Sequence, residues 1–393
     1  MTESELKTVV SLFSGIGGIE YGLSQHGFET IHFSEIDELA RGVLRTRFPA
    51  AEFSTDVKLL RALPDSDVLT AGFPCQDLSQ AGVKRGIGGG KSGLVVRLFE
   101  LLGRKPKKRR PRFLVIENVP YMLRLGGGDA MTYLTGELER LGYDWAYRVV
   151  DARSFGLPQR RPRVVLLAAL DSDPRAVLFS DNHREQDMDG RPADFSRASW
   201  YGFYWTEGSR GVGWARDAVP PIKCGSTLGI ASPPAIWQPK RDFAGTLHIM
   251  DAERLQGFPE SWTDFEQCGI DARPSLRWRL VGNAVCTRMA AWIGSRLRQP
   301  AGGDFESHPF LDERRWPNAA WGGRGKRSAA RVSTWAGKGE APKLADFLRH
   351  DLKPLSSRAT RGFLSRAEAC TNVVYAERFL DSLRRHAECQ EQT

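Results

Sequence analysis

The chain has 393 residues, of which 41% are apolar and 26% are charged. This composition supports a buried core and excludes a disordered, collagen-like or wholly coiled-coil protein. Lys and Arg outnumber Asp and Glu by 56 to 47, and the net charge of +9 suits a nucleic-acid partner and equally an ordinary basic enzyme. No stretch has the roughly 20 apolar residues of a membrane span, and the acidic start Met1–Glu5 does not resemble a signal peptide. We therefore expect a soluble, cytoplasmic protein with two domains and an appendage.

Short apolar runs alternate with amphipathic stretches up to about residue 170. Several of the runs are continuously apolar, as in strands that are buried on both faces of a parallel sheet. The alternation predicts a doubly wound α/β domain over residues 1–170. The predicted strands are Thr8–Phe13, Thr30–Ser34, Val68–Phe73, Phe113–Ile116, Trp145–Val150 and Val164–Leu170, and the predicted helices between them include Glu38–Phe48 and Met131–Leu141.

The pattern changes over residues 171–247, where aromatic residues cluster, Gly and Pro become more frequent and helical periodicity fades. This predicts a small, loop-rich, β-containing domain. Helical patterns return at Asp251–Gln256 and Ala284–Arg298, so we expect residues 248–299 to rejoin the first domain and the small domain to be an insertion.

Residues 300–393 contain a Gly-, Arg- and Trp-rich stretch followed by two helix-like segments with apolar faces. Such faces have to be buried against something. We expect this C-terminal extension to pack on the first domain, on a second copy of the chain or on a partner protein. An independent DNA clamp is the alternative.

A glycine-rich loop follows the first predicted strand, and an acidic residue ends the second. Glycines at this place let a ligand approach the backbone at a helix N-terminus, and Glu35, twenty residues after Gly15, suits the diol of a ribose. A nicotinamide dinucleotide and S-adenosylmethionine both contain a ribose. The adjacent Gly17 and Gly18 break the G-x-G-x-x-G spacing, which favours S-adenosylmethionine.

Reactive side chains follow three further strands. Cys75 comes directly after Pro74 at the end of a strand, where ligands bind in such sheets. Glu117 ends the next strand, and Arg161 and Arg163 enter the last one. A thiol beside a carboxyl suits covalent attack with proton transfer, and two guanidinium groups nearby favour the thiolate. The six cysteines include no C-x-x-C pair, so we expect reduced thiols and no metal.

Taken in order, these motifs closely resemble those of the DNA cytosine-5 methyltransferases. The resemblance extends from about Lys7 to Leu297 and covers all but the C-terminal extension. It rests on several separate motifs that agree in order and spacing: Ser11-Leu12-Phe13-Ser14-Gly15-Ile16-Gly17-Gly18, Glu35, Pro74-Cys75-Gln76, Glu117-Asn118-Val119, Gln159-x-Arg161-x-Arg163, Arg254-Leu255-Gln256-Gly257-Phe258-Pro259 and Gly282-Asn283-Ala284-Val285.

The resemblance implies a Rossmann-like methyltransferase fold and a catalytic set. Cys75 would attack C6 of a cytosine flipped out of the duplex, and Glu117 would act at N3. Arg163, with Arg161 beside it, would hold the base oxygen O2 and a nearby phosphate or carboxyl. The segment Asp77–Leu94 would close over the base as a mobile loop.

The resemblance also implies a site for S-adenosyl-L-methionine, with S-adenosyl-L-homocysteine as the product and no metal. Sixteen residues would contact the cofactor. Some would stack on the adenine, some would contact the amino-acid end through their backbone, and acidic side chains would bind the ribose and the adenine. These are Phe13, Ser14, Gly15, Ile16, Gly17, Gly18, Glu35, Ile36, Asp56, Val57, Gly72, Phe73, Pro74, Leu94, Asn283 and Ala284.

Residues 171–247 take the place of the family's target recognition domain, and Thr227-Leu228 matches a pair typical of it. The implied partner is double-stranded DNA, which would associate a bacterial enzyme with the nucleoid in a restriction-modification or phage-defence system. A tRNA cytosine-5 methyltransferase and a catalytically silent DNA-binding relative remain as alternatives. The length of the insertion favours DNA over tRNA, and the intact reactive residues argue against a silent protein.

Overall fold

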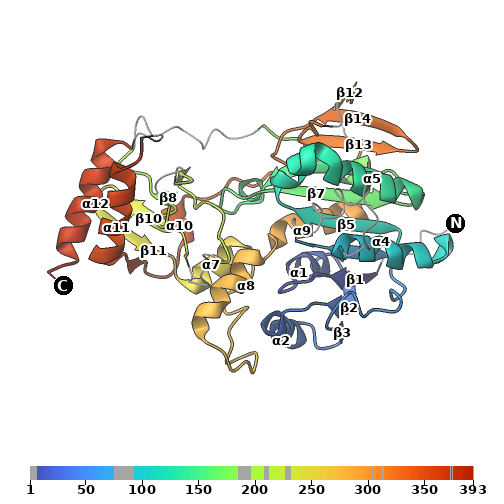
Figure 1. Cartoon of the computed structure of the whole chain (residues 1–393), viewed down its shortest axis with the longest axis horizontal. Coiled ribbons are helices and arrows are strands. Elements are labelled where there is room, and N and C mark those ends of the chain that lie inside the picture. The colour runs from blue at the N-terminus through green and yellow to red at the C-terminus, as the bar shows by residue number, and fades with distance from the viewer. Residues whose placement is uncertain are drawn as a thin grey trace.

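The structure is a computed structural model that describes residues 7–74, 93–184, 196–207, 212–225, 232–302, 305–310, 314–371, 373 and 375–392. The elements gather into a large α/β lobe and a small lobe that faces one end of it (Figure 1). No helix among these residues is long and apolar enough to cross a membrane. Cys75, most of the predicted loop Asp77–Leu94 and the pair Thr227-Leu228 lie outside the described residues.

A ten-stranded sheet forms the centre of the large lobe. From one edge to the other its strands are β12 (Glu306–Pro309), β14 (Lys326–Arg331), β13 (Ala319–Gly323), β6 (Asp144–Asp151), β7 (Pro162–Ala169), β5 (Phe113–Asn118), β4 (Val68–Ala71), β1 (Thr8–Leu12), β2 (Glu29–Ser34) and β3 (Glu52–Ser54).

The strands β1 to β5 run parallel to one another, as predicted, but β7 runs antiparallel to both of its neighbours, β5 and β6. The α/β sheet that the sequence predicts is therefore parallel over five strands and antiparallel at β7. A continuously apolar run shows that a strand is buried on both faces and carries no information about its direction. The reversal brings the start of β7 beside the end of β5.

Successive residues of each central strand point to opposite faces, and a separate layer of helices covers each face. Val9 of β1 belongs to a core with α1 (Gly18–Ser24) and α9 (Thr287–Arg298). Val10 belongs to a second core with α4 (Leu94–Arg104) and α5 (Asp129–Arg140). This three-layer arrangement leaves the carboxyl ends of β1, β2, β4 and β5 open at one edge.

The C-terminal extension first widens the large sheet. Its strand β13 pairs with β6 and with β14, both antiparallel, and Trp316 packs against Trp145 and Tyr147. Arg148 is fully buried and donates to the backbone oxygens of Leu178, Asp181, Ser333 and Trp335. The sequence predicts only helices for residues 300–393, so the strands β12, β13 and β14 were not predicted.

The extension then completes the small lobe. A five-stranded antiparallel sheet has the order β15 (Lys353–Pro354), β11 (Phe243–Thr246), β10 (Ala235–Gln238), β8 (Tyr201–Phe203) and β9 (Ala215–Arg216). The helices α11 (Ser357–Glu368) and α12 (Glu377–Cys389) share an apolar core with this sheet. Within that core Trp237 Nε1 donates to Ser382 Oγ at 2.8 Å. The small lobe is thus built from two segments that are far apart in the sequence.

Shorter or connecting helices complete the fold: α2 (Glu38–Arg47), α6 (Arg175–Leu178), α7 (Ile249–Leu255), α8 (Arg277–Asn283), α10 (Leu344–Phe347), and the 3-10 turns Lys107–Arg109, Pro120–Gly128, Ala152–Ser154 and Pro274–Leu276. Of these, α7 and α8 lie between the two lobes (Figure 1).

Candidate active site

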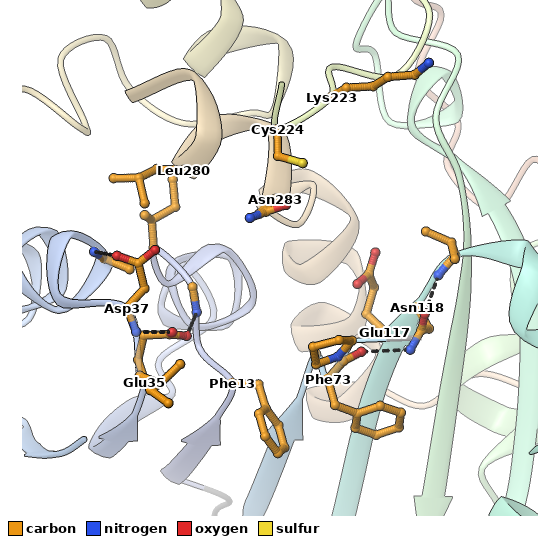
Figure 2. A pocket seen from close by; sticks show the side chains of 18 of the residues that line it. Phe13, Glu35, Asp37, Phe73, Glu117, Asn118, Lys223, Cys224, Leu280 and Asn283 are labelled. Atoms are coloured by element: carbon orange, nitrogen blue, oxygen red, sulfur yellow. Dashed lines mark hydrogen bonds between the residues drawn. The ribbon is translucent and has the colours of Figure 1, made fainter. Parts of the chain in front are cut away.

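A cavity of about 820 Å³ lies at the open edge of the large sheet, between the two lobes. Its size falls in the range of small-molecule sites. Figure 2 shows Phe13, Phe73 and Glu117 at the strand ends below, with Lys223 and Cys224 of the small lobe above. The structure brings together here most of the residues that the resemblance selects: Phe13, Gly15, Ile16, Glu35, Ile36, Asp56, Val57, Gly72, Phe73, Pro74, Leu94, Glu117, Arg161, Arg163 and Asn283.

One end of the cavity is apolar and aromatic. Phe13 has a left-handed backbone, with φ of 58°, and its ring meets Phe73 edge to face at 6.1 Å. A non-glycine residue in this conformation is strained, and such strain tends to occur at functional sites. Ile36 is 71% exposed at the rim, so it is available to cover a flat apolar group and is not a core residue.

Glu35 is held by the backbone of the loop across from it. Its Oε2 accepts from the N–H of Gly15 at 2.7 Å, and its Oε1 accepts from the N–H of Asp37 at 2.8 Å. Burial raises the pKa of Glu35, although these two hydrogen bonds oppose the rise. A Cβ added to Gly15 would meet no atom within 4 Å, so the loop leaves space beside the carboxylate for a ligand.

The other end of the cavity holds an ion pair. Arg163 is the second residue of β7, and Glu117 is the fifth residue of the adjacent β5. The Arg163 Nε donates to Glu117 Oε1 at 2.9 Å, and each side chain is 11% exposed. The antiparallel direction of β7 is what brings these two residues together.

Arg161 lines the cavity wall, but its guanidinium is bound to backbone. It donates to the carbonyl oxygens of Ile222 at 3.2 Å, Gly282 at 3.2 Å and Ala284 at 2.7 Å, and the residue is 3% exposed. Burial lowers its pKa to about 9. From its place in the cavity wall, Arg161 therefore fastens the loop at Ile222 and the end of α8 to the large lobe.

Two glutamines continue this connection between the lobes. Gln159 donates through Nε2 to Leu255 O at 2.8 Å and accepts through Oε1 from the N–H of Ile222 at 3.2 Å. Gln256 donates to Val281 O at 2.8 Å. The glutamines of the Gln-x-Arg-x-Arg and Arg-Leu-Gln-Gly motifs are thus buried hydrogen-bonding residues that hold the site together.

Four residues of the predicted cofactor set lie outside the large cavity. Ser14, Gly18 and Ala284 line a smaller cavity of about 50 Å³ directly behind it. Gly17 lines neither cavity. A Cβ at this position would meet the Phe48 ring at 2.7 Å, so the glycine allows Phe48 to pack closely against the loop.

Sequence reasoning missed the part of the cavity that comes from the small lobe. Loops supply this wall, and no periodicity or motif marks it in the sequence. Asn118 has no role in the site that the sequence predicts. It donates to Phe73 O at 3.0 Å and accepts from the N–H of Val119 at 2.9 Å, so it fixes the strand end that precedes Cys75. The other missed lining residues are Ser34, Asp37, Ala40, Val119, Tyr204, Pro221, Ile222, Lys223, Cys224, Gly225, Leu280 and Gly282.

The donor set fits S-adenosyl-L-methionine. The cavity combines exposed apolar and aromatic side chains, an acceptor carboxylate beside an open glycine loop, and a polar end formed by the pair of Glu117 and Arg163. Within the described residues there is no group of three or more His, Cys, Asp and Glu side chains that could hold a metal ion.

Comparisons with known proteins agree with this geometry. Residues 7–197 match the family described as C-5 cytosine-specific DNA methylase. The chain is 57% identical over 380 residues to the type II methyltransferase M2.BsuMI of Bacillus subtilis strain 168, a match that covers 96% of this chain and 97% of that protein. It is 34% identical over 161 residues to the type II methyltransferase M.BsuFI of Bacillus subtilis, which covers 41% of this chain and 38% of that protein.

A solved structure shows the same fold. The Dnmt2 methyltransferase of S. pombe superposes with a TM-score of 0.54 at 18% identity, and the match covers 75% of this chain and 99% of that chain.

Proposed function

The chain belongs to the C-5 cytosine-specific DNA methylases, and from this we propose that it methylates C5 of cytosine within a specific sequence of duplex DNA. The enzyme is a DNA methyltransferase of the type found in restriction-modification systems. The observation that carries the proposed site is the ion pair between Glu117 and Arg163 at the polar end of a cavity suited to the cofactor.

The cofactor S-adenosyl-L-methionine supplies an electrophilic methyl group on a sulfonium and leaves as S-adenosyl-L-homocysteine. Glu35 would accept hydrogen bonds from the ribose hydroxyls, and Phe13, Ile36 and Asp56 would hold the adenine. The glycine loop would contact the amino-acid end, since Gly15 faces open space.

Cytosine C5 is a poor nucleophile, so the chain has to activate the ring. We assign the attack on C6 to the Cys75 thiolate, which raises the electron density at C5. Glu117 would protonate or hydrogen-bond N3 as the ring becomes negatively charged. Arg163 would orient Glu117 and hold the base oxygen O2. After methylation, a water-mediated base would take the C5 proton, and the electrons of that bond would form the C5–C6 double bond and release the thiolate from C6.

The base has to leave the duplex to reach this pocket. We assign target recognition to the small lobe, because its residues Tyr204, Lys223 and Cys224 form the wall opposite the sheet edge. Arg161 would act as a positioning residue that holds this wall in place, given its bonds to Ile222, Gly282 and Ala284.

A covalent trap tests the proposal. Duplex DNA that carries 5-fluorocytosine in its recognition sequence should form a stable adduct with the parent protein in the presence of the cofactor, because fluorine cannot leave as a proton does. Cys75→Ala should form no adduct but should still bind DNA and the cofactor. Equal adduct formation by both proteins would refute the role of Cys75.

A further inference from the structure

A carboxyl group that this mechanism does not use lies behind the glycine loop. Glu20 is the third residue of α1 and is 2% exposed. Its Oε1 accepts from Thr70 Oγ1 at 2.5 Å. This partner is neutral. Burial of a carboxyl group without a cationic partner lowers the stability of the fold. A residue kept at such a cost is a candidate for a functional role.

The position of Glu20 connects it with the reactive end of the site. Glu20 and Thr70 line the small cavity of about 50 Å³. Its walls include Gly72, Glu117 and Asn283, which also line the large cavity. The two cavities also share Phe13, Gly15 and Ile16, so the small cavity borders the large one from its aromatic end to Glu117, the end at which the target base would lie.

Under the proposed function, the methyl donor has to face the base at this same end. Its sulfonium carries one positive charge, and the sulfur of the product carries none. The two molecules are otherwise alike in their adenine, ribose and amino-acid groups. An electric field at the reactive end would therefore act on one and not on the other.

We propose that Glu20 makes the site prefer the cationic methyl donor to its neutral product. This inference rests on the proposed function and concerns the choice between the two forms of the cofactor. Burial raises the pKa of Glu20, and the Thr70 hydroxyl and the place of Glu20 in the first turn of α1 oppose that rise, so the carboxylate charge acts above the raised pKa. At an effective dielectric constant of about 20, unit charges roughly 10 Å apart attract each other enough to change affinity roughly tenfold.

Binding measurements on Glu20→Gln test this directly. Titration calorimetry with S-adenosyl-L-methionine and with S-adenosyl-L-homocysteine should show affinity for the donor reduced roughly tenfold, with affinity for the product changed less than about twofold. Equal losses for the two molecules would mean that Glu20 is merely structural, and no change in either would also overturn the proposal. A parent protein that binds neither molecule would instead contradict the proposed function.

Glu253→Gln is the matched control. Glu253 is also fully buried and accepts from Thr263 and Arg277, but it lines neither cavity. This variant should lose stability and keep the ratio of the two affinities. A change in ratio as large as that of Glu20→Gln would show that any buried carboxyl has the effect and would refute the assignment.

Thr70→Val keeps the inference testable if Glu20→Gln does not fold. Burial raises the pKa of Glu20, and the Thr70 hydroxyl opposes that rise. Removing the hydroxyl should raise the pKa further, so the preference for the donor should disappear at a higher pH than in the parent. The other carboxyl that shares the cavity is Glu117, which is paired with Arg163. An identical pH dependence of the affinity ratio in parent and variant would overturn the proposal.

Discussion

Arg163 Nε donates to Glu117 Oε1 at 2.9 Å from the neighbouring strand, and the two side chains are equally buried. The bond exists because β7 runs antiparallel to β5, which places the start of one strand beside the end of the other. A carboxylate has two oxygens with about four lone pairs, so one ion pair orients Glu117 without using all of its acceptor capacity. This geometry suits a carboxyl group that has to be held in a fixed orientation toward N3 of the cytosine.

Glu117→Gln should lower turnover by about two to four powers of ten, the usual contribution of an acid–base group. The amide keeps the shape of the side chain and cannot supply a proton in the same way. Methyl incorporation under single-turnover conditions measures the effect. Glu137→Gln, on α5 where Glu137 pairs with Arg140 and lines neither cavity, should leave the rate unchanged. Near-normal turnover in Glu117→Gln would mean that another group acts at N3.

Arg163→Lys should also slow turnover, because an ammonium group cannot reproduce the planar contact of a guanidinium. One of the two roles of Arg163 acts through its bond to Glu117, so the two effects should not be fully additive. The double variant with Glu117→Gln should be faster than the product of the two single losses predicts. Multiplicative rate losses in the double-mutant cycle would show that Arg163 acts independently of Glu117.

Arg161→Met should destabilise the protein by about 3 kcal/mol or more, since it leaves buried carbonyl oxygens without donors. Urea unfolding measures this change. Arg273→Met, at an exposed position, should change stability by less than about 0.5 kcal/mol. If Arg161→Met kept full stability and lost only catalysis, Arg161 would be a direct substrate contact.

The catalytic edge could be predicted because the relevant residues follow strand ends. Parallel strands bring their carboxyl ends together, so Phe13, Glu35 and Glu117 converge whatever the details of packing. The direction of β7 could not be predicted, since its apolar run is compatible with either direction. The role of Arg161 was also hidden, because a charged residue near a motif gives no sign that backbone carbonyls will surround it.

The small lobe was less predictable still. Its wall of the cavity comes from loops, and half of its core comes from residues more than 100 positions later in the chain, as the pair of Trp237 and Ser382 shows. The apolar faces of α11 and α12 did indicate that something would cover them. The sequence could not show that the recognition segment of the same chain would do so.

Exchange of residues 171–247 with those of a relative should therefore change the methylated sequence only if the partner segment 344–392 is exchanged as well. Replacing the first segment alone would remove Trp237 and its neighbours from the core that they share with α11 and α12, and the new residues would face helices of another sequence. Solubility, melting temperature and the methylated sequence of both chimaeras check this. A stable single-segment chimaera with altered specificity would contradict a shared core.

Affinity for the cofactor should fall as the pH is lowered, and the fall should begin above the range of an ordinary glutamate. Burial raises the pKa of Glu35, so its acceptor carboxylate is present above that raised pKa and is lost below it. Both S-adenosyl-L-methionine and S-adenosyl-L-homocysteine contain the ribose, so protonation of Glu35 should weaken the binding of both, whereas protonation of Glu20 should weaken the donor alone. Glu35→Gln should remove this contribution to the pH dependence, and an unchanged profile in the variant would assign it to another group.

The most direct test of the central claim is to sequence methylated cytosines in DNA from cells that express this chain. Cells with the parent protein should carry 5-methylcytosine at one recurring sequence, and cells with Cys75→Ala or Glu117→Gln should not. The absence of 5-methylcytosine in the DNA of cells that contain soluble parent protein, or its presence to the same extent with Cys75→Ala, would contradict the account.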